Sequence, residues 1–195
     1  MGKTVEFLFD VGSPASYIAF KRLPGIAERT GAEIDYRPFL LGGVFKATGN
    51  RSPAETPAKA AWTSRDLARF AAKHDVPFER NPHFPINTLH LMRGAAGLQG
   101  DPRFMPYLEA VFEAMWRTPR NLGNPAEMAP VLERAGIGAE AFRELIEDEA
   151  TKARLKSTTE DAVARGAFGA PTFFVDGELY FGQDRLDWVE EALSA

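Results

Sequence analysis

Ser13 is the residue of this chain best placed to do chemistry, because it stands where a strand ends and a helix begins. The apolar run from Val5 to Phe9 has the length and residue types of a strand, and Gly12 permits a tight turn after it. Ser13 then has the residue type of a helix N-cap, and Pro14 occupies the first helical position. The free N–H groups and positive dipole end of such a helix attract an anion. Ser13 therefore either caps this helix only, or also donates a hydrogen bond to a bound anion.

A second motif near the end of the sequence gives this serine a context. Ala170-Pro171 precedes an apolar strand from Thr172 to Val175, and Asp176-Gly177 predicts a hairpin turn into one more strand. A strand, turn and helix at the start, with a proline-led hairpin and a helix at the end, is the thioredoxin-like layout. In that layout the proline is normally cis and faces the N-terminus of the first helix.

Composition excludes several classes of function. The 195 residues are 45% hydrophobic and 26% charged, with a net charge of −4, which gives no electrostatic argument for nucleic-acid binding. No apolar run of membrane-spanning length is present, and the first residues lack the apolar region of a signal peptide, so we expect a cytoplasmic protein. The chain has no cysteine, and its three histidines follow no metal-ligand spacing. We therefore expect neither disulfides nor a metal site.

The elements that position these motifs follow from hydrophobic periodicity. A strand at Thr4–Phe9, a helix from Pro14 to about Thr30 and a strand at Glu33–Phe39 form a βαβ unit with parallel strands. Residues 48–53 are polar and rich in helix breakers, and the last helix is expected over Arg185–Ala195. Between these parts, helical periodicity predicts six helices, near Pro57–His74, Thr88–Leu98, Pro102–Trp116, Pro125–Ala135, Ala139–Asp148 and Thr151–Arg165.

The predicted fold class is therefore α/β, a thioredoxin-like fold with a large all-helical insertion. We predict a discontinuous thioredoxin-like domain of residues 1–40 and 166–195 and a helical insertion domain of residues 41–165.

Over essentially its whole length the chain resembles the 2-hydroxychromene-2-carboxylate isomerases and the kappa-class glutathione transferases. Both groups resemble the DsbA-type thiol oxidoreductases in fold. The segments that carry the resemblance are residues 9–17 (F-D-V-G-S-P-A-S-Y), 48–50 (T-G-N), Lys59, 111–116 (V-F-E-A-M-W), 168–175 (F-G-A-P-T-F-F-V) and 181–186 (F-G-Q-D-R-L).

The resemblance implies a role for Ser13 in binding glutathione. Redox members of the fold carry C-P-x-C where this chain has Ser13-Pro14-Ala15-Ser16, so protein-borne redox chemistry is excluded. In the resembling families the serine that matches Ser13 stabilises the thiolate of bound glutathione. A free thiol has a pKa of about 8.5, and one such hydrogen bond plus the helix terminus could lower that pKa by roughly 1–3.

The resemblance also implies the other contacts with glutathione. The backbone of Ala170 would pair with the cysteinyl part of the tripeptide, as an added strand does. Asn50 matches an asparagine that binds glutathione, and Lys59 matches a lysine that reaches one of its carboxylates. Gln183 and Asp184 match the loop that holds the γ-glutamyl end, with Asp184 as partner of its ammonium. Lys59 could instead be a solvated helix residue, and Asp184 could also cap the last helix.

The pocket for a second substrate is expected beside the sulfur. The connector 81–87 and the helix after it would shape this pocket, although aromatic residues at such spacings often belong to the core. Gly12 departs from the bulkier apolar residue that many family members carry, which could change the space beside the sulfur. The side chains expected to line the pocket are Tyr17, Phe45, Trp62, Asn87 and Trp116.

The expected function is thus a cytoplasmic, glutathione-dependent isomerase acting on a small aromatic substrate of the 2-hydroxychromene-2-carboxylate kind, in the catabolism of aromatic compounds. The first alternative is a kappa-class-like transferase that conjugates glutathione to electrophiles. The second is a redox-inactive thioredoxin-fold protein that binds peptides. The resemblance also implies a homodimer.

Overall fold

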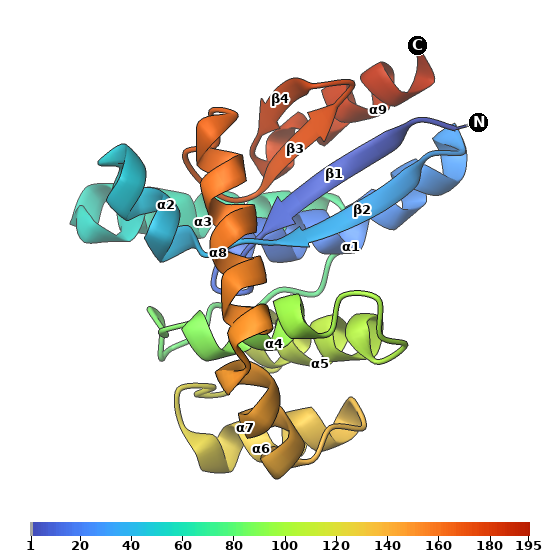
Figure 1. Ribbon diagram of the computed structural model, residues 1–195. Coiled ribbons are helices and arrows are strands. Elements are labelled where there is room, and N and C mark those ends of the chain that lie inside the picture. The colour runs from blue at the N-terminus through green and yellow to red at the C-terminus, as the bar shows by residue number, and fades with distance from the viewer. Residues whose placement is uncertain (1) are drawn as a thin grey trace.

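The computed structural model describes residues 2–195, and a four-stranded sheet organises them (Figure 1). The strand order is β2-β1-β3-β4. β1 pairs with β2 in parallel, whereas the pairs β1–β3 and β3–β4 are antiparallel, as the βαβ unit and the hairpin predict. The strands are β1 (Thr4–Phe9), β2 (Glu33–Pro38), β3 (Thr172–Val175) and β4 (Glu178–Phe181).

The hairpin and the first helix end where the sequence predicts. Asp176 and Gly177 both have positive φ, of 50° and 86°, which is the backbone of a tight two-residue hairpin turn. Gly31 ends α1 in the left-handed conformation, with φ of 67°. α1 (Pro14–Thr30) and α9 (Leu186–Ser194) contact each other behind the sheet in the view of Figure 1.

All helices between β2 and β3 follow each other without an intervening strand. Figure 1 shows α4 to α7 below the sheet, while the long helix α8 runs from that lower part back up to the sheet. The six helices predicted for this segment are confirmed, with ends displaced by no more than two residues. The bounds are α2 (Leu41–Thr48), α3 (Pro57–Lys73), α4 (Leu89–Gly97), α5 (Phe104–Trp116), α6 (Pro125–Arg134), α7 (Ala139–Glu147) and α8 (Glu149–Ala164). A short 3₁₀ turn at Pro53–Glu55 precedes α3, and another at Gln183–Arg185 lies between β4 and α9.

One continuous hydrophobic core joins the sheet to most of these helices. It contains Phe7 and Phe9 of β1 together with Met92 of α4, Met115 of α5 and Phe142 of α7, all essentially inaccessible to solvent. The helical segment therefore packs against the sheet through shared apolar side chains. Its proposed division from the thioredoxin-like part at residues 40 and 166 stays a prediction.

The sequence did not predict the helix α2, because the contacts that stabilise it come from distant parts of the chain. Its sequence contains Gly42 and Gly43, which are poor helix formers. A Cβ at Gly43 would lie 3.2 Å from Cγ2 of Thr159, so the glycine permits the close approach of α2 to α8. The start of α2 is held by the carboxylate of Asp10, which directly follows β1, as described below.

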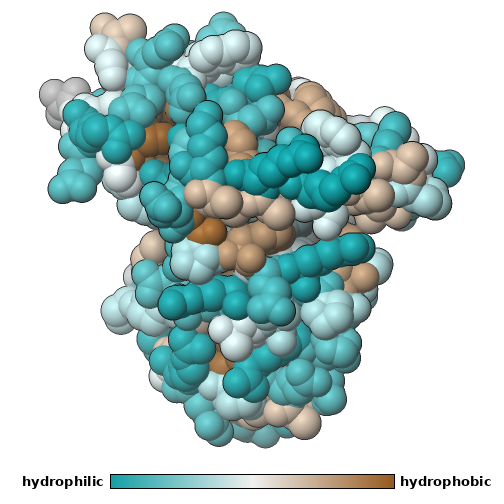
Figure 2. Space-filling view, turned by 180° about the vertical axis from the view of Figure 1, so that it is seen from behind, coloured by the Kyte–Doolittle hydropathy of each residue, from teal (hydrophilic) through white to brown (hydrophobic). Residues whose placement is uncertain are grey.

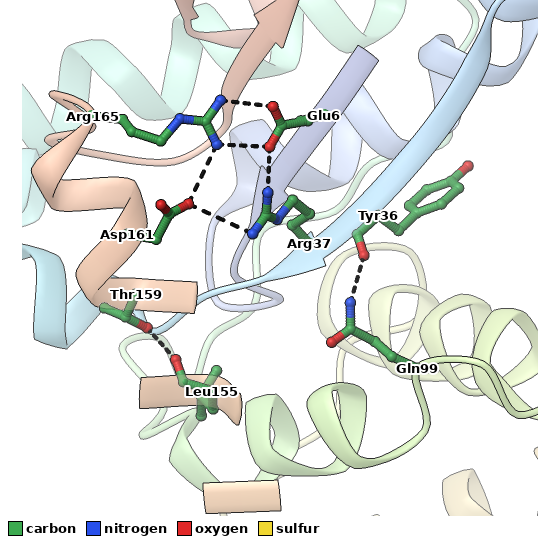
Figure 3. A network of polar contacts seen from close by, with 8 residues as sticks. All are labelled: Glu6, Tyr36, Arg37, Gln99, Leu155, Thr159, Asp161 and Arg165. Atoms are coloured by element: carbon green, nitrogen blue, oxygen red, sulfur yellow. Dashed lines mark hydrogen bonds and ion pairs between the residues drawn. The ribbon is translucent and has the colours of Figure 1, made fainter. Parts of the chain in front are cut away.

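A network of charged residues joins α8 to the sheet (Figure 3). Arg165, just after α8, donates two hydrogen bonds to the carboxylate of Glu6 on β1, at 2.6 and 2.7 Å. Arg37 of β2 also pairs with Glu6, and Asp161 of α8 accepts a hydrogen bond from Arg165 and forms an ion pair with Arg37. The guanidinium of Arg165 lies 3.7 Å from the ring centre of Phe174 on β3. Since three strands and α8 meet in this network, it fixes the start of the segment that leads into β3.

Candidate functional site

The structure brings the two motifs at opposite ends of the chain into direct contact at Ser13. The side chain of Ser13 caps α1 by accepting a hydrogen bond from the backbone N–H of Ser16 at 3.1 Å. The same hydroxyl donates to the carbonyl oxygen of Ala170, also at 3.1 Å. The Ala170-Pro171 peptide bond is cis, as the thioredoxin-like layout implies. The start of α1 and the cis-proline segment therefore face each other.

The loop that carries Ser13, residues 10–13 and hereafter the Ser13 loop, is held by the helical segment. The N–H of Val11 donates to the sulfur of Met92 at 3.3 Å, and its carbonyl accepts from the indole N–H of Trp116 at 2.8 Å. The N–H of Ser13 donates to the carbonyl of Asp10 at 2.9 Å. Trp116 is 1% exposed, so this side chain supports the loop from the core.

Asp10 holds the same loop with its side chain, and sequence reasoning missed it. Its carboxylate is 1% exposed and accepts hydrogen bonds from Gly12 N, Leu41 N and Thr88 Oγ1 at 2.9, 2.9 and 3.1 Å. Burial raises the pKa of Asp10, while these hydrogen bonds act in the opposite direction. An acid that directly follows a buried strand and precedes the candidate serine was the signal in the sequence.

The packing beneath this loop leaves no room for a side chain at position 12, which is a glycine. A Cβ at position 12 would lie 2.8 Å from Cγ2 of Thr88 and 3.3 Å from Oδ1 of Asp10. The space that a bulkier residue would need is therefore occupied by Thr88.

Asn50 ties the end of α2 to the segment before the cis proline. Its Nδ2 donates to the carbonyl of Phe168 at 2.8 Å, and its Oδ1 accepts from the N–H of Arg51 at 2.8 Å. Phe168 packs on Phe181 of β4, with ring centres 4.5 Å apart. Asn50 therefore lies at the cis-proline segment with its amide bonded to protein partners, and its contact with glutathione stays a prediction.

Gln183 and Asp184 follow a residue that is hydrogen-bonded to the cis proline. The N–H of Gly182 donates to the carbonyl of Pro171 at 3.0 Å, which brings the following residues beside Pro171. The carboxylate of Asp184 pairs with Arg185 at 2.7 Å. The N-cap position of α9 is Arg185 and makes no side-chain capping bond, so Asp184 does not cap this helix.

The remaining predicted residues divide into exposed and buried groups. Lys59 is exposed on α3 and makes no ion pair within residues 2–195, and Trp62 on the next turn is 57% exposed. Phe45 is half-buried, and exposed Asn87 accepts from the N–H of Leu89 at the start of α4. Tyr17 and Trp116 are fully buried in the core, which leaves Phe45, Trp62 and Asn87 with surface that a substrate could meet.

The surface around these elements is mixed. Figure 2 shows hydrophilic upper and lower parts with apolar surface gathered between them.

Within the described residues 2–195, no group of three or more His, Cys, Asp or Glu residues is placed to bind a metal ion. No helix in that range has the length and apolar character needed to cross a bilayer.

Comparison with known proteins agrees with this architecture. Residues 4–194 match the family of DsbA-like thioredoxin domains. The chain is 33% identical to a 2-hydroxychromene-2-carboxylate isomerase of Sphingobium xenophagum, covering 99% of both chains, and 30% identical to human glutathione S-transferase kappa 1, covering 98% of this chain and 91% of the transferase. A solved structure of a 2-hydroxychromene-2-carboxylate isomerase superimposes with a TM-score of 0.87 at 29% identity, covering 97% of this chain and 94% of that one. The chain thus belongs to the enzyme family of the 2-hydroxychromene-2-carboxylate isomerases and kappa-class glutathione transferases, built on a DsbA-like thioredoxin domain.

Proposed function

We propose that this protein is a glutathione-dependent isomerase in which Ser13 stabilises the glutathione thiolate. The observation that carries the proposal is the hydrogen bond from Ser13 Oγ to Ala170 O beside the cis proline. It brings a hydroxyl donor, a helix N-terminus and the backbone of the residue before the cis proline close to one another. These are the three groups that a cysteinyl residue with an ionised sulfur can use.

Binding would exchange one hydrogen bond for two. The cysteinyl N–H of glutathione donates to Ala170 O, which releases the hydroxyl of Ser13 from that acceptor. The released hydroxyl then donates to the sulfur, while Ser13 Oγ still accepts from Ser16 N. A charge-assisted hydrogen bond of this kind favours the thiolate over the thiol and therefore lowers the thiol pKa.

The charged ends of the tripeptide have candidate partners on both sides. Lys59 is an exposed cation without an ion-pair partner in the described chain, which suits a glutathione carboxylate. Asp184 is exposed and could share its carboxylate between Arg185 and the γ-glutamyl ammonium. Gln183 and Asn50 would complete the binding site from the segments that flank Pro171.

The isomerase reaction uses glutathione as a nucleophile that is returned at the end. When bound, glutathione would supply a nucleophilic thiolate for the opening of the ring of a 2-hydroxychromene-2-carboxylate-like hemiketal and its conversion to the trans benzylidenepyruvate-type product. The protein contributes positioning of the two reactants and stabilisation of the anion. Such a reaction belongs to aromatic-compound catabolism, and we also propose a homodimer that works in the cytoplasm.

Calorimetry and product analysis test this function. We expect glutathione to bind, and an aromatic hemiketal substrate to isomerise with the concentration of free glutathione unchanged. A transferase, which the similarity to human glutathione S-transferase kappa 1 keeps as the alternative, would instead consume glutathione in step with product. Absence of glutathione binding at millimolar concentration, together with measurable peptide binding, would favour a peptide-binding protein and contradict both enzymes.

Replacing Lys59 with alanine should weaken glutathione binding by about 5- to 20-fold, because a charge-assisted hydrogen bond to a carboxylate is lost. Titration calorimetry measures the change in dissociation constant. Lys73→Ala, at the exposed far end of the same helix, is the matched control and should bind glutathione like the wild type. Equal affinities of the two variants would show that Lys59 is only a solvated helix residue.

A further inference from the structure

Asp10 supplies the buried carboxylate of the Ser13 loop, and the mechanism above does not use it. Its two oxygens accept three hydrogen bonds, from Gly12 N to Oδ1 and from Leu41 N and Thr88 Oγ1 to Oδ2. No arginine, lysine or histidine pairs with it among residues 2–195, so neutral donors alone satisfy this group. A buried acid without a counter-charge costs free energy, which argues that its position has a purpose beyond stability.

The three donors come from three separate parts of the chain. Gly12 belongs to the Ser13 loop, Leu41 is the first residue of α2, and Thr88 is the N-cap residue of α4. The N-cap residues of α2 and α4, Leu40 and Thr88, make no side-chain capping bond to their own helices. The carboxylate of Asp10 caps α2 instead, by accepting the N–H of Leu41 at the positive end of the helix. The hydroxyl of Thr88 is directed to Asp10 instead of its own helix.

These helices lead directly to the predicted ligand contacts. α2 ends two residues before Asn50, whose amide holds the segment before the cis proline. Asn87 directly precedes Thr88 and lies at the predicted substrate pocket. A displacement of Asp10 would therefore move the Ser13 loop relative to both of these segments.

We propose that Asp10 is a positioning residue whose buried carboxylate holds the Ser13 loop in register with the starts of α2 and α4. Its assigned effect on bound glutathione rests on the proposed function, whereas its effect on the loop does not. An amide could not replace the carboxylate, because all three of its partners are donors. The NH₂ group of an asparagine would face at least one of them and push the loop out of place.

Thr88→Val is the decisive variant, since it removes one donor and leaves the charge of Asp10 and the side-chain size nearly unchanged. Ultraviolet titration of bound glutathione should show a thiol pKa raised by about half a unit or more in Thr88→Val. Thr88→Ser, which keeps the hydroxyl, should restore the wild-type value, and Asp10→Asn should raise the pKa further. Thr30→Val, which removes a hydroxyl bond at the far end of α1, should leave the thiol pKa unchanged.

A role of Asp10 through its charge alone predicts the opposite sign for Asp10→Asn. Removing an anion near the thiolate favours the thiolate and lowers its pKa. A lowered or unchanged thiol pKa in both Thr88→Val and Asp10→Asn would therefore overturn the positioning role, even if both variants are less stable.

Amide hydrogen exchange gives a readout that does not require glutathione. In Thr88→Val the amides of Gly12 and Leu41 should exchange about tenfold faster than in the wild type, and Thr88→Ser should return them to wild-type rates. If the wild type fails to bind glutathione, the proposed function fails and this exchange alone decides the proposal. Unchanged exchange at both amides would overturn it.

Discussion

Ser13→Ala should lower kcat/KM for isomerisation by about 10- to 100-fold, because the hydrogen bond from its hydroxyl to the thiolate is lost. The pKa of the bound glutathione thiol should rise toward the value of the free tripeptide, since the helix terminus alone contributes less than the hydroxyl. Ultraviolet absorbance of the thiolate against pH measures this shift directly. A variant of undiminished activity whose bound thiol titrates as in the wild type would remove Ser13 from the chemistry.

Ser16→Ala is the matched control for this prediction. Ser16 lies in the same first helical turn, is fully buried, and its Oγ has no hydrogen-bond partner among residues 2–195. Removing an unpaired buried hydroxyl costs nothing and improves helix propensity, so stability should stay equal or rise slightly. Because Ser16 has no surface for a ligand, the thiol pKa and the activity should remain those of the wild type. A similar loss in both variants would indicate general damage to the helix.

The second large effect is expected from Glu6→Gln, which should lower the free energy of unfolding by about 2–3 kcal/mol. The Glu6 side chain is 22% exposed and accepts hydrogen bonds from Arg165 and Arg37. The variant therefore leaves two partly buried guanidinium groups with only the more exposed carboxylate of Asp161 as a counter-charge. Urea unfolding at neutral pH measures the loss. Glu190→Gln is the control, because its partner Arg29 is largely exposed and such pairs contribute little. Equal losses in the two variants would contradict a special role of the Glu6 network.

The same variant has a defined pH dependence. Hydrogen bonding from Arg165, followed by that from Arg37, holds the pKa of Glu6 below its ordinary value of 4.5, against the effect of burial. A lowered pKa means that Glu6 adds stability above about pH 4.5, which is lost as the pH falls through its folded-state pKa. The difference in stability between wild type and Glu6→Gln should therefore shrink on acidification. A difference that is constant with pH would mean that the carboxylate charge is not its source.

The elements that could be predicted from the sequence are those with strong local signals. Apolar runs predicted β1 and β3, and alternation predicted β2. Ser13 and Gly31 have the residue types that begin and end a helix, which explains both ends of α1. Asp176-Gly177 is a residue pair that tolerates positive φ at both positions, so the sequence predicts the hairpin turn found there. The contact between Ser13 and Ala170 followed from a layout that is specific to one fold. For the strands, the helix ends and the turn, the cause of the structure lies within a few residues of the motif, whereas the contact between Ser13 and Ala170 joins residues 157 positions apart.

The parts that could not be predicted depend on partners far away in the chain. α2 begins at Leu41 because Asp10 accepts its N–H, and it can contain Gly43 because α8 packs there. No local pattern shows that Trp116 donates to Val11 from inside the core and presents no surface to a substrate. The roles assigned to Lys59, Gln183 and Asp184 depend on a ligand and stay predictions.

A crystal structure of the protein with glutathione tests the central claim most directly. It should show the sulfur within hydrogen-bond distance of Ser13 Oγ, about 3.0–3.5 Å for a sulfur acceptor, with the cysteinyl backbone paired to Ala170. A tripeptide bound elsewhere on the protein, or a sulfur directed away from Ser13, would contradict the proposed mechanism.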